Sequence, residues 1–244
     1  MNGVRGVLYR ELRIYGRRWK KHLASYTVSP FLFLVVFGWG VGRSVEMEGV
    51  GYLAFMIPGL ATMAAMNQSY GAATEINIAR FYWRVFEEFQ MAPVRAWEIA
   101  LGEVVYGMVR GLAAAGAVYL LATLFRAPIP FRGATAALFA LHTFTFASAA
   151  VVAAMVVRSH ADQGHINTFF IVPMAFLCGT FFPLSRLPGW AEALAYCLPL
   201  THSSLAIRAA SLGRPLPWPH VAAMAAFGVA FFALAVWSVR RATG

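Results

Sequence analysis

The chain has 244 residues, of which 60% are hydrophobic and only 12% are charged. A soluble domain usually carries about 25% charged residues, and a chain this apolar could not cover its surface with polar groups. The composition therefore excludes a disordered chain, argues against an ordinary soluble enzyme and indicates an integral membrane protein. The formal net charge is +10, and all basic residues except Lys20 and Lys21 are arginine.

Six stretches are long and apolar enough to cross a bilayer as helices, which takes roughly 20 mostly apolar residues. They cover residues 24–42, 52–73, 99–125, 134–157, 167–182 and 218–239. Prolines and glycines interrupt the semi-apolar stretch before the last of them, which favours short helices over a seventh span. We predict an all-α integral membrane protein with a single transmembrane domain over residues 1–244. Its expected parts are an interfacial helix in 1–23, five spans in 24–182, short re-entrant or outer-leaflet helices in 183–217 and a sixth span in 218–239.

The basic residues in the connecting segments predict the orientation of these spans, because cytoplasmic loops carry an excess of Lys and Arg. Thirteen basic residues, seven of them before the first span, fall on the side that holds both termini, and six fall on the other side. We therefore expect both termini in the cytoplasm. The positive charge follows from this topology, so no nucleic-acid partner is expected.

Residues 4–22 have the pattern of an amphipathic helix. Apolar residues recur there at three- and four-residue spacing, namely Val4, Leu8, Leu12, Tyr15 and Trp19. Basic residues occupy the other face, namely Arg5, Arg13, Arg17 and Lys20. Such a helix lies in the membrane interface, where it serves as an anchor to anionic lipid, as a docking surface for a cytoplasmic partner, or as both.

The motifs of common enzymes are absent from the sequence. A P-loop needs Lys before Ser or Thr, whereas Lys20 and Lys21 are followed by His22. The sequence contains neither a His-Glu-x-x-His zinc motif nor a Gly-x-Ser-x-Gly nucleophile elbow. We therefore predict no catalytic residue, no cofactor site and no metal site, and we expect Cys178 and Cys197 to be a buried and an interfacial thiol.

Two charged residues fall inside the predicted third span, where a charge is costly and marks a candidate functional position. Arg110 lies about 16 Å into this span, at 1.5 Å per residue. Glu103 precedes it by seven residues, which places both on one face of the helix. This face either lines a polar pathway or a subunit interface, or forms an internal pair with a neighbouring helix.

Other candidate pathway residues lie in the second and fifth spans. Asn67 and Gln68 begin a polar patch near the cytoplasmic end of the second span, which suits either a moving element or static helix packing. Phe181 and Phe182 belong to a Phe-rich stretch. Their rings either face a sugar or a lipid substrate or simply meet membrane lipid and pack.

The segment between the second and third spans combines charged and aromatic residues. Its aromatic residues are too few to form a core by themselves. It needs the bilayer, the N-terminal helix or a partner, and it is well placed to receive force from a soluble motor. The residues that we expect to contact such a partner are Glu75, Arg80, Trp83, Arg84, Glu87 and Glu88.

Three motifs give the chain a family resemblance. One is Phe55-Met-Ile-Pro58-Gly59, a second is Pro93-Val94 followed by Glu98-Ile99 and Gly102, and a third runs from Gly179 to Trp190 and on to Pro199-Leu-Thr-His202 and Arg208. In these motifs the chain resembles the permease subunit of type-2 ABC exporters, in the branch that exports nodulation lipo-oligosaccharides, polysaccharides and drugs. The resemblance covers essentially the whole chain.

The resemblance implies a half-transporter of the bacterial inner membrane. A second permease copy, as a homodimer or a heterodimer, and two copies of a separate ABC ATPase subunit would complete it, and the ATPase would bind the ATP and Mg. The segment from Glu75 to Glu88 would supply the coupling helix. The short helices would form the exit region, with an exit motif of Pro183, Pro188, Pro199, Thr201, His202 and Arg208.

Three functions remain open at this point. The first is ATP-driven export of a lipid-linked or amphipathic glycan, in which the chain itself is not an enzyme. The second is export of a hydrophobic drug, whose pathway can be more apolar than that of a glycan. The third, from another class, is a membrane scaffold subunit that transports nothing.

Overall fold

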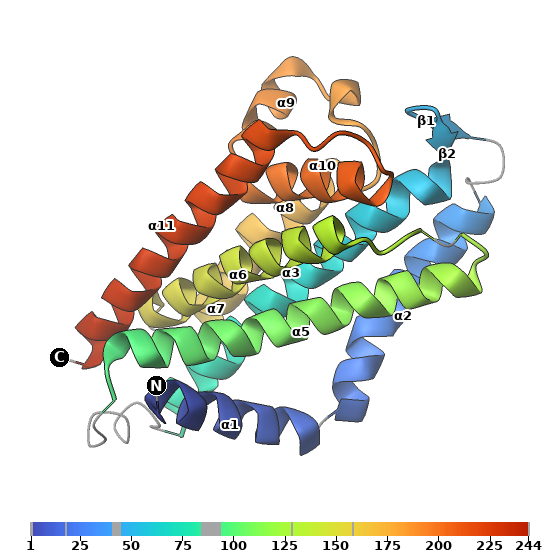
Figure 1. Cartoon of the computed structure of the whole chain (residues 1–244). Helices are drawn as coiled ribbons and strands as arrows, with labels where there is room; N and C mark the ends of the chain where they lie inside the picture. Colours follow the sequence, from blue (N-terminus) through green and yellow to red (C-terminus); the bar gives the residue numbers. More distant parts are fainter. Residues whose placement is uncertain are drawn as a thin grey trace.

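The computed structural model describes residues 2–17, 19–40, 45–83, 94–127, 129–157 and 159–243. The described chain is almost entirely helical, and its long helices run side by side (Figure 1). The long helices are α1 (Asn2–Arg17), α2 (Trp19–Gly40), α3 (Tyr52–Phe81), α5 (Ala96–Leu124), α6 (Gly133–Val156) and α11 (Trp218–Thr243). A two-residue antiparallel pair, β1 (Glu46–Met47) and β2 (Val50–Gly51), precedes α3.

Shorter helices lie between α6 and α11. They are α7 (His160–Ile166), the π-helical turn η1 (Asn167–Ile171), α8 (Val172–Leu177), the 3₁₀ turn η2 (Leu184–Arg186), α9 (Gly189–Tyr196) and α10 (Pro199–Ser211). The predicted fifth span is therefore built from consecutive short helices and ends at Leu177, before the irregular stretch that leads to Pro183. Short helices after Pro183 agree with the prediction for this part of the chain.

The core lies where α3, α5 and α6 meet. Small residues allow this close approach: a Cβ atom added to Gly111 of α5 would lie 2.0 Å from Ser69 Oγ of α3 and 2.6 Å from Thr143 Cγ2 of α6. One turn earlier on α5, a Cβ atom on Gly107 would lie 2.7 Å from the Cβ of Ala147. Glycine at these two positions brings the three helices into backbone contact.

Three of the described helices are long and apolar enough to cross a membrane by length and composition, namely α5, α6 and residues 218–242 of α11. Helices α2 and α3 carry more polar residues, and two of those in α3, Gln68 and Glu75, find partners inside the chain, as described below. Three helices extend beyond the spans predicted from hydropathy. Helix α2 begins at Trp19, α3 continues to Phe81 instead of ending near residue 73, and α11 continues to Thr243.

The N-terminal amphipathic segment was also predicted too long. Helix α1 ends at Arg17, and Trp19 belongs to α2. The face of α1 that is buried carries Val7, which packs on Gly102 of α5, where an added Cβ would lie 2.8 Å from Val7 Cβ. Leu12 and Trp19, which we expected on the apolar face, are exposed. The contact with Gly102 of α5 is therefore made by Val7, which was not among the residues of the predicted apolar face.

The two termini lie at the same end of the bundle, near the end of α3 and the start of α5 (Figure 1). Helices α9 and α10 lie toward the opposite end. Both cysteines are free thiols. Cys178 is buried, as expected from the sequence, and Cys197 is exposed, while its place at the membrane interface stays a prediction.

Candidate functional site

A buried polar cluster joins α3 to α5 at the position of Arg110. This side chain is only 6% exposed. Its Nη1 lies 2.9 Å from Oε1 of Glu75, and its Nη2 donates a hydrogen bond of 3.2 Å to Oε1 of Gln68. Tyr106 completes the cluster, because its hydroxyl donates to Oε2 of Glu75 at 2.5 Å and its ring lies 5.7 Å from the guanidinium carbon.

Helical spacing brings these four side chains together. Gln68 and Glu75 are seven residues apart on α3, and Tyr106 and Arg110 are four apart on α5, so each pair lies on one face of its helix. The Nε2 of Gln68 also donates to Oγ of Ser25 on α2 at 3.2 Å. Three helices therefore meet at this cluster, and the charge of Arg110 is balanced inside one chain.

Glu103 belongs to a second ionic group, although it shares a face of α5 with Arg110. It is 2% exposed, and its Oε1 lies 3.6 Å from Nη2 of Arg10 on α1. Arg10 also donates to the buried Glu11. This group attaches α1 to α5 through charges as well as through Val7. Of the two roles considered for Arg110, the structure shows the internal pair with a neighbouring helix, and a pathway role stays a prediction.

The remaining candidate pathway residues are dispersed. Asn67 is exposed, whereas the neighbouring Gln68 belongs to the cluster. Phe181 is buried, with its ring centroid 5.0 Å from that of Phe33 and 5.6 Å from that of Phe37 on α2. Phe182 is partly buried. The ring of Phe181 thus packs between helices, and the hydroxyl of Tyr52 donates to its carbonyl oxygen at 3.2 Å.

Arg208 of α10 connects Phe55 of α3 with the turn at Gly179, at the other end of the molecule. It is 3% exposed, its Nε donates to the carbonyl of Phe55 at 3.1 Å, and its Nη2 donates to the carbonyl of Gly179. The guanidinium carbon lies 3.9 Å above the ring centroid of Phe55. Gly59 leaves the space for this contact, because a Cβ there would lie 2.9 Å from Nη2 of Arg208. The Pro-Gly motif of α3 and the Arg208 motif of α10 therefore form one contact.

The other exit-motif residues hold α10 against its neighbours. Thr201 is buried and its hydroxyl donates to the carbonyl of Ala195 on α9 at 2.5 Å. His202 bonds through Nδ1 to Nδ1 of His220 on α11 at 2.8 Å and through Nε2 to the carbonyl of Tyr196 at 3.0 Å. Prolines precede or open the short helices, namely Pro183 before η2, Pro188 before α9 and Pro199 at the start of α10.

The candidate coupling residues lie at the end of α3 and beyond it. Glu75 is in α3 itself rather than in the loop after it. Arg80 is partly buried, and its Nη1 donates to the carbonyls of Ala154 and Met155 at 3.1 and 2.8 Å, so it caps the C-terminal end of α6. Trp83 is exposed. Arg84, Glu87 and Glu88 lie outside the described residues.

Sequence reasoning missed several members of these groups. Tyr106 escaped notice because a tyrosine in a span is ordinary, although its position four residues before Arg110 was a usable signal. Arg10 and Glu11 were not among the predicted site residues, and nothing in the sequence indicates that Arg10 of α1 would pair with Glu103 of α5. Within the described residues, no three His, Cys, Asp or Glu side chains are grouped as a metal site would require.

The chain belongs to the ABC-2 type transporter family, whose model matches residues 3–212. The match includes the buried cluster at Arg110, the end of α3 and the Arg208 contact. The chain is therefore the transmembrane permease component of an ABC transporter. Membership implies an ABC ATPase as its partner, in agreement with the resemblance found in the sequence.

Individual relatives cover most of the chain. Nodulation protein J of Rhizobium meliloti is 32% identical over 232 residues, which span 91% of this chain and 88% of that protein. Nodulation protein J of Sinorhizobium fredii is 30% identical over 236 residues, with the same coverage. The inner membrane transport permease YadH of Escherichia coli strain K12 is 25% identical over 215 residues, which span 86% of this chain and 83% of that protein.

Proposed function

We propose that the chain is one half of the membrane part of an ATP-driven exporter for a lipid-linked or amphipathic glycan. Two copies would pair, and two ATPase subunits would bind their cytoplasmic faces. The observation that carries the proposal is the match to the ABC-2 family over residues 3–212. The names of the relatives support transport across the inner membrane, and in two of them a role in nodulation.

The proposed topology has six spans, formed by α2, α3, α5, α6, the segment α7–η1–α8, and α11. Both termini would face the cytoplasm, and α9 and α10 would lie in the outer leaflet. Thirteen basic residues on the terminal side against six on the other support this orientation. Gln68 and Glu75 do not oppose a span by α3, because both are paired with Arg110.

Helix α3 offers a route for force from the ATPase. It runs without interruption for 30 residues, which is about 45 Å at 1.5 Å per residue. Its cytoplasmic end carries the exposed Trp83 just beyond the last turn, and its other end holds Gly59 against Arg208. A movement of the bound ATPase would thus be transmitted to the exit helices along α3. The Glu75–Arg110 pair would make α5 move with it.

Substrate-stimulated ATP hydrolysis tests the proposal. The complex is reconstituted in vesicles of its native lipids and given an amphipathic glycolipid, a hydrophobic drug or neither. We expect the glycolipid to raise the hydrolysis rate severalfold and the drug to leave it unchanged. Stimulation by the drug alone would make the chain a drug exporter, and the absence of any stimulation together with absence of transport would make it a scaffold.

A further inference from the structure

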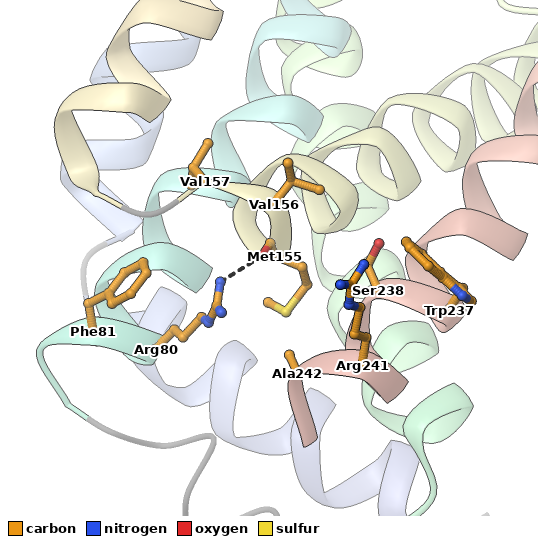
Figure 2. Close-up of a pocket in the computed structure, with 9 residues that line it drawn as sticks. All are labelled: Arg80, Phe81, Met155, Val156, Val157, Trp237, Ser238, Arg241 and Ala242. Atoms are coloured by element: carbon orange, nitrogen blue, oxygen red, sulfur yellow. Dashed lines mark hydrogen bonds between the residues drawn. The ribbon is translucent and has the colours of Figure 1, made fainter. Parts of the chain in front are cut away.

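A pocket lies where three helices end together, at the end of the molecule that holds both termini. It has a volume of about 460 Å³ and is lined by the last turns of α3, α6 and α11 (Figure 2). The space is far larger than a bound water requires. It is separate from the cluster at Arg110 and from the Arg208 contact. Among the described residues that are expected to contact the ATPase, Arg80 alone lines it.

The polar groups of this pocket suit an anion. Arg80 of α3 lies on one side, and Arg241 and Ser238 of α11 lie on the other (Figure 2). None of the lining residues is acidic. Ser238 is only 6% exposed, and its Oγ has no hydrogen-bond partner in the described part of the chain. A buried hydroxyl without a partner is costly. Rotation of the Ser238 side chain from its covered position toward the pocket would let a phosphate oxygen satisfy it.

The helix ends themselves oppose an anion, because the last carbonyls of a helix carry partial negative charge. Arg80 offsets this effect at α6 by donating to the carbonyls of Ala154 and Met155. Two of its N–H groups are therefore engaged. Arg241 is exposed and lines the pocket, and its guanidinium carbon lies 5.6 Å from the ring centroid of Trp237, a contact that uses none of its N–H groups as hydrogen-bond donors to an oxygen. Arg241 is thus the principal charge for a ligand.

The rim of the pocket is apolar and exposed. Trp237 is 55% exposed and Val156 is 64% exposed, and Phe81 is exposed as well. Tryptophan concentrates at the level of lipid headgroups, and basic pockets between membrane helices on the cytoplasmic side bind anionic headgroups. A free inorganic ion would use the arginines but would leave the apolar rim in water, whereas a phospholipid would use both.

We propose that this pocket binds the phosphate headgroup of an anionic phospholipid from the cytoplasmic leaflet, with Arg241 and Ser238 as its main polar contacts and its acyl chains along Trp237 and Val156. The assignment of this lipid to the cytoplasmic leaflet rests on the orientation proposed above, and the rest of this proposal does not. The bound lipid would tie the ends of α6 and α11 together beside the end of α3, next to the segment expected to receive the ATPase.

The test measures lipid affinity of the full chain purified in mild detergent, by the rise in Tm with added phosphatidylglycerol, with phosphatidylcholine and inorganic phosphate as comparison probes. Ligand that binds only the folded state raises stability with concentration. We expect a response to phosphatidylglycerol alone. Arg241→Gln should weaken the affinity for phosphatidylglycerol about tenfold or more, which is the usual cost of losing a hydrogen bond to a charged group. Ser238→Ala, a small change that removes only the unpartnered hydroxyl, should weaken it about threefold.

Arg240→Gln is the matched control, since it removes the same charge at the next position of α11 but at a residue that does not line the pocket. It should keep the lipid response. Equal losses in Arg240→Gln and Arg241→Gln would show diffuse attraction and overturn the proposal. An equal response to inorganic phosphate would overturn it in favour of a small-anion site. An unchanged lipid response in Arg241→Gln and Ser238→Ala, with loss of a co-purifying ATPase, would make the pocket a protein-docking surface.

These results are independent of the proposed function, because lipid affinity is measured without transport or hydrolysis. A scaffold subunit with the pocket would still respond to phosphatidylglycerol, and an exporter without the lipid site would still hydrolyse ATP. Failure of one claim therefore leaves the other to be judged by its own measurement.

Discussion

Arg110 shows how a costly residue inside a span is made tolerable. Its charge meets Glu75 at 2.9 Å, with Gln68 and Tyr106 as further partners. Removing one member of a buried ion pair leaves the other charge without compensation, which costs more than replacing both members. Substitution of Arg110 alone should therefore lower the stability of the protein if Arg110 acts as one half of a structural pair, whereas substitution of a residue that only lines a pathway should not.

Arg110→Leu should lower the free energy of unfolding by about 2–3 kcal/mol, less than for a fully buried pair because Glu75 is about a third exposed. The double variant Glu75→Leu with Arg110→Leu should be less destabilised than Arg110→Leu alone. Thermal unfolding in detergent measures both, and Arg186→Leu, at an exposed position, is the control. If Arg110→Leu keeps full stability yet abolishes transport, Arg110 lines a pathway and the structural account of it is wrong.

The sequence predicted where this charge lies but not its partner. The depth of Arg110 within the span followed from its position alone. The partner did not, because Glu75 lay in a segment that we predicted as the start of a loop. The polar residues of α3 interrupt the apolar run, so the apparent span ended near residue 73 although the helix continues to Phe81. Tertiary pairing, which hydropathy does not reveal, keeps those residues helical.

At the scale of elements, the packing of α5 against α3 and α6 depends on glycine. A Cβ on Gly111 would overlap Ser69 and Thr143, whereas Gly116, farther along the same helix, has open space around it. The sequence shows both glycines without distinguishing them. The contact surface of α5 could not be found from its composition, because most of its residues are small or apolar on every side.

Gly111→Ala should therefore destabilise the protein by about 1–3 kcal/mol, the usual cost of overpacking. Gly116→Ala should be neutral or stabilise it by up to about 1 kcal/mol, because alanine favours the helix and meets no neighbour. Both are read from unfolding midpoints of the purified full chain. Equal effects of the two substitutions would contradict the close packing of the three helices.

The contact at Arg208 makes a further prediction about an element, because it attaches α10 to α3. Lysine cannot reproduce the planar guanidinium that both covers the ring of Phe55 and donates to two carbonyls. Arg208→Lys should increase amide hydrogen exchange in α10 severalfold and leave α5 unchanged. Arg214→Lys, at a more exposed ion pair with Glu48, is the control and should have little effect. Unaltered exchange in α10 of Arg208→Lys would show that the contact does not hold this helix.

At the scale of the whole molecule, the helical architecture was predictable because hydropathy and the positions of proline mark where helices form and end. All-helical structure and short helices after Pro183 came from these signals. The docking of α1 did not, because its contact with α5 rests on Gly102 and on the Arg10–Glu103 contact rather than on periodicity.

The cysteines provide a test of the proposed orientation. Cys197 of the α9–α10 region is exposed and Cys178 is buried. In intact cells, a membrane-impermeant maleimide should label the chain at Cys197, and Cys197→Ser should abolish the labelling while Cys178→Ala leaves it intact. Labelling that occurs only after the cells are opened would place α9 on the cytoplasmic side and reverse the topology.

The central claim is that a separate motor drives this permease, and the most direct measurement is purification of the tagged full chain from its native membranes in mild detergent. We predict that a soluble P-loop ATPase co-purifies in an equal amount and hydrolyses ATP. Trp83→Ala, at the exposed end of α3, should reduce its recovery, whereas Trp190→Ala, exposed at the other end, should not. A chain that purifies without any ATPase would contradict the account.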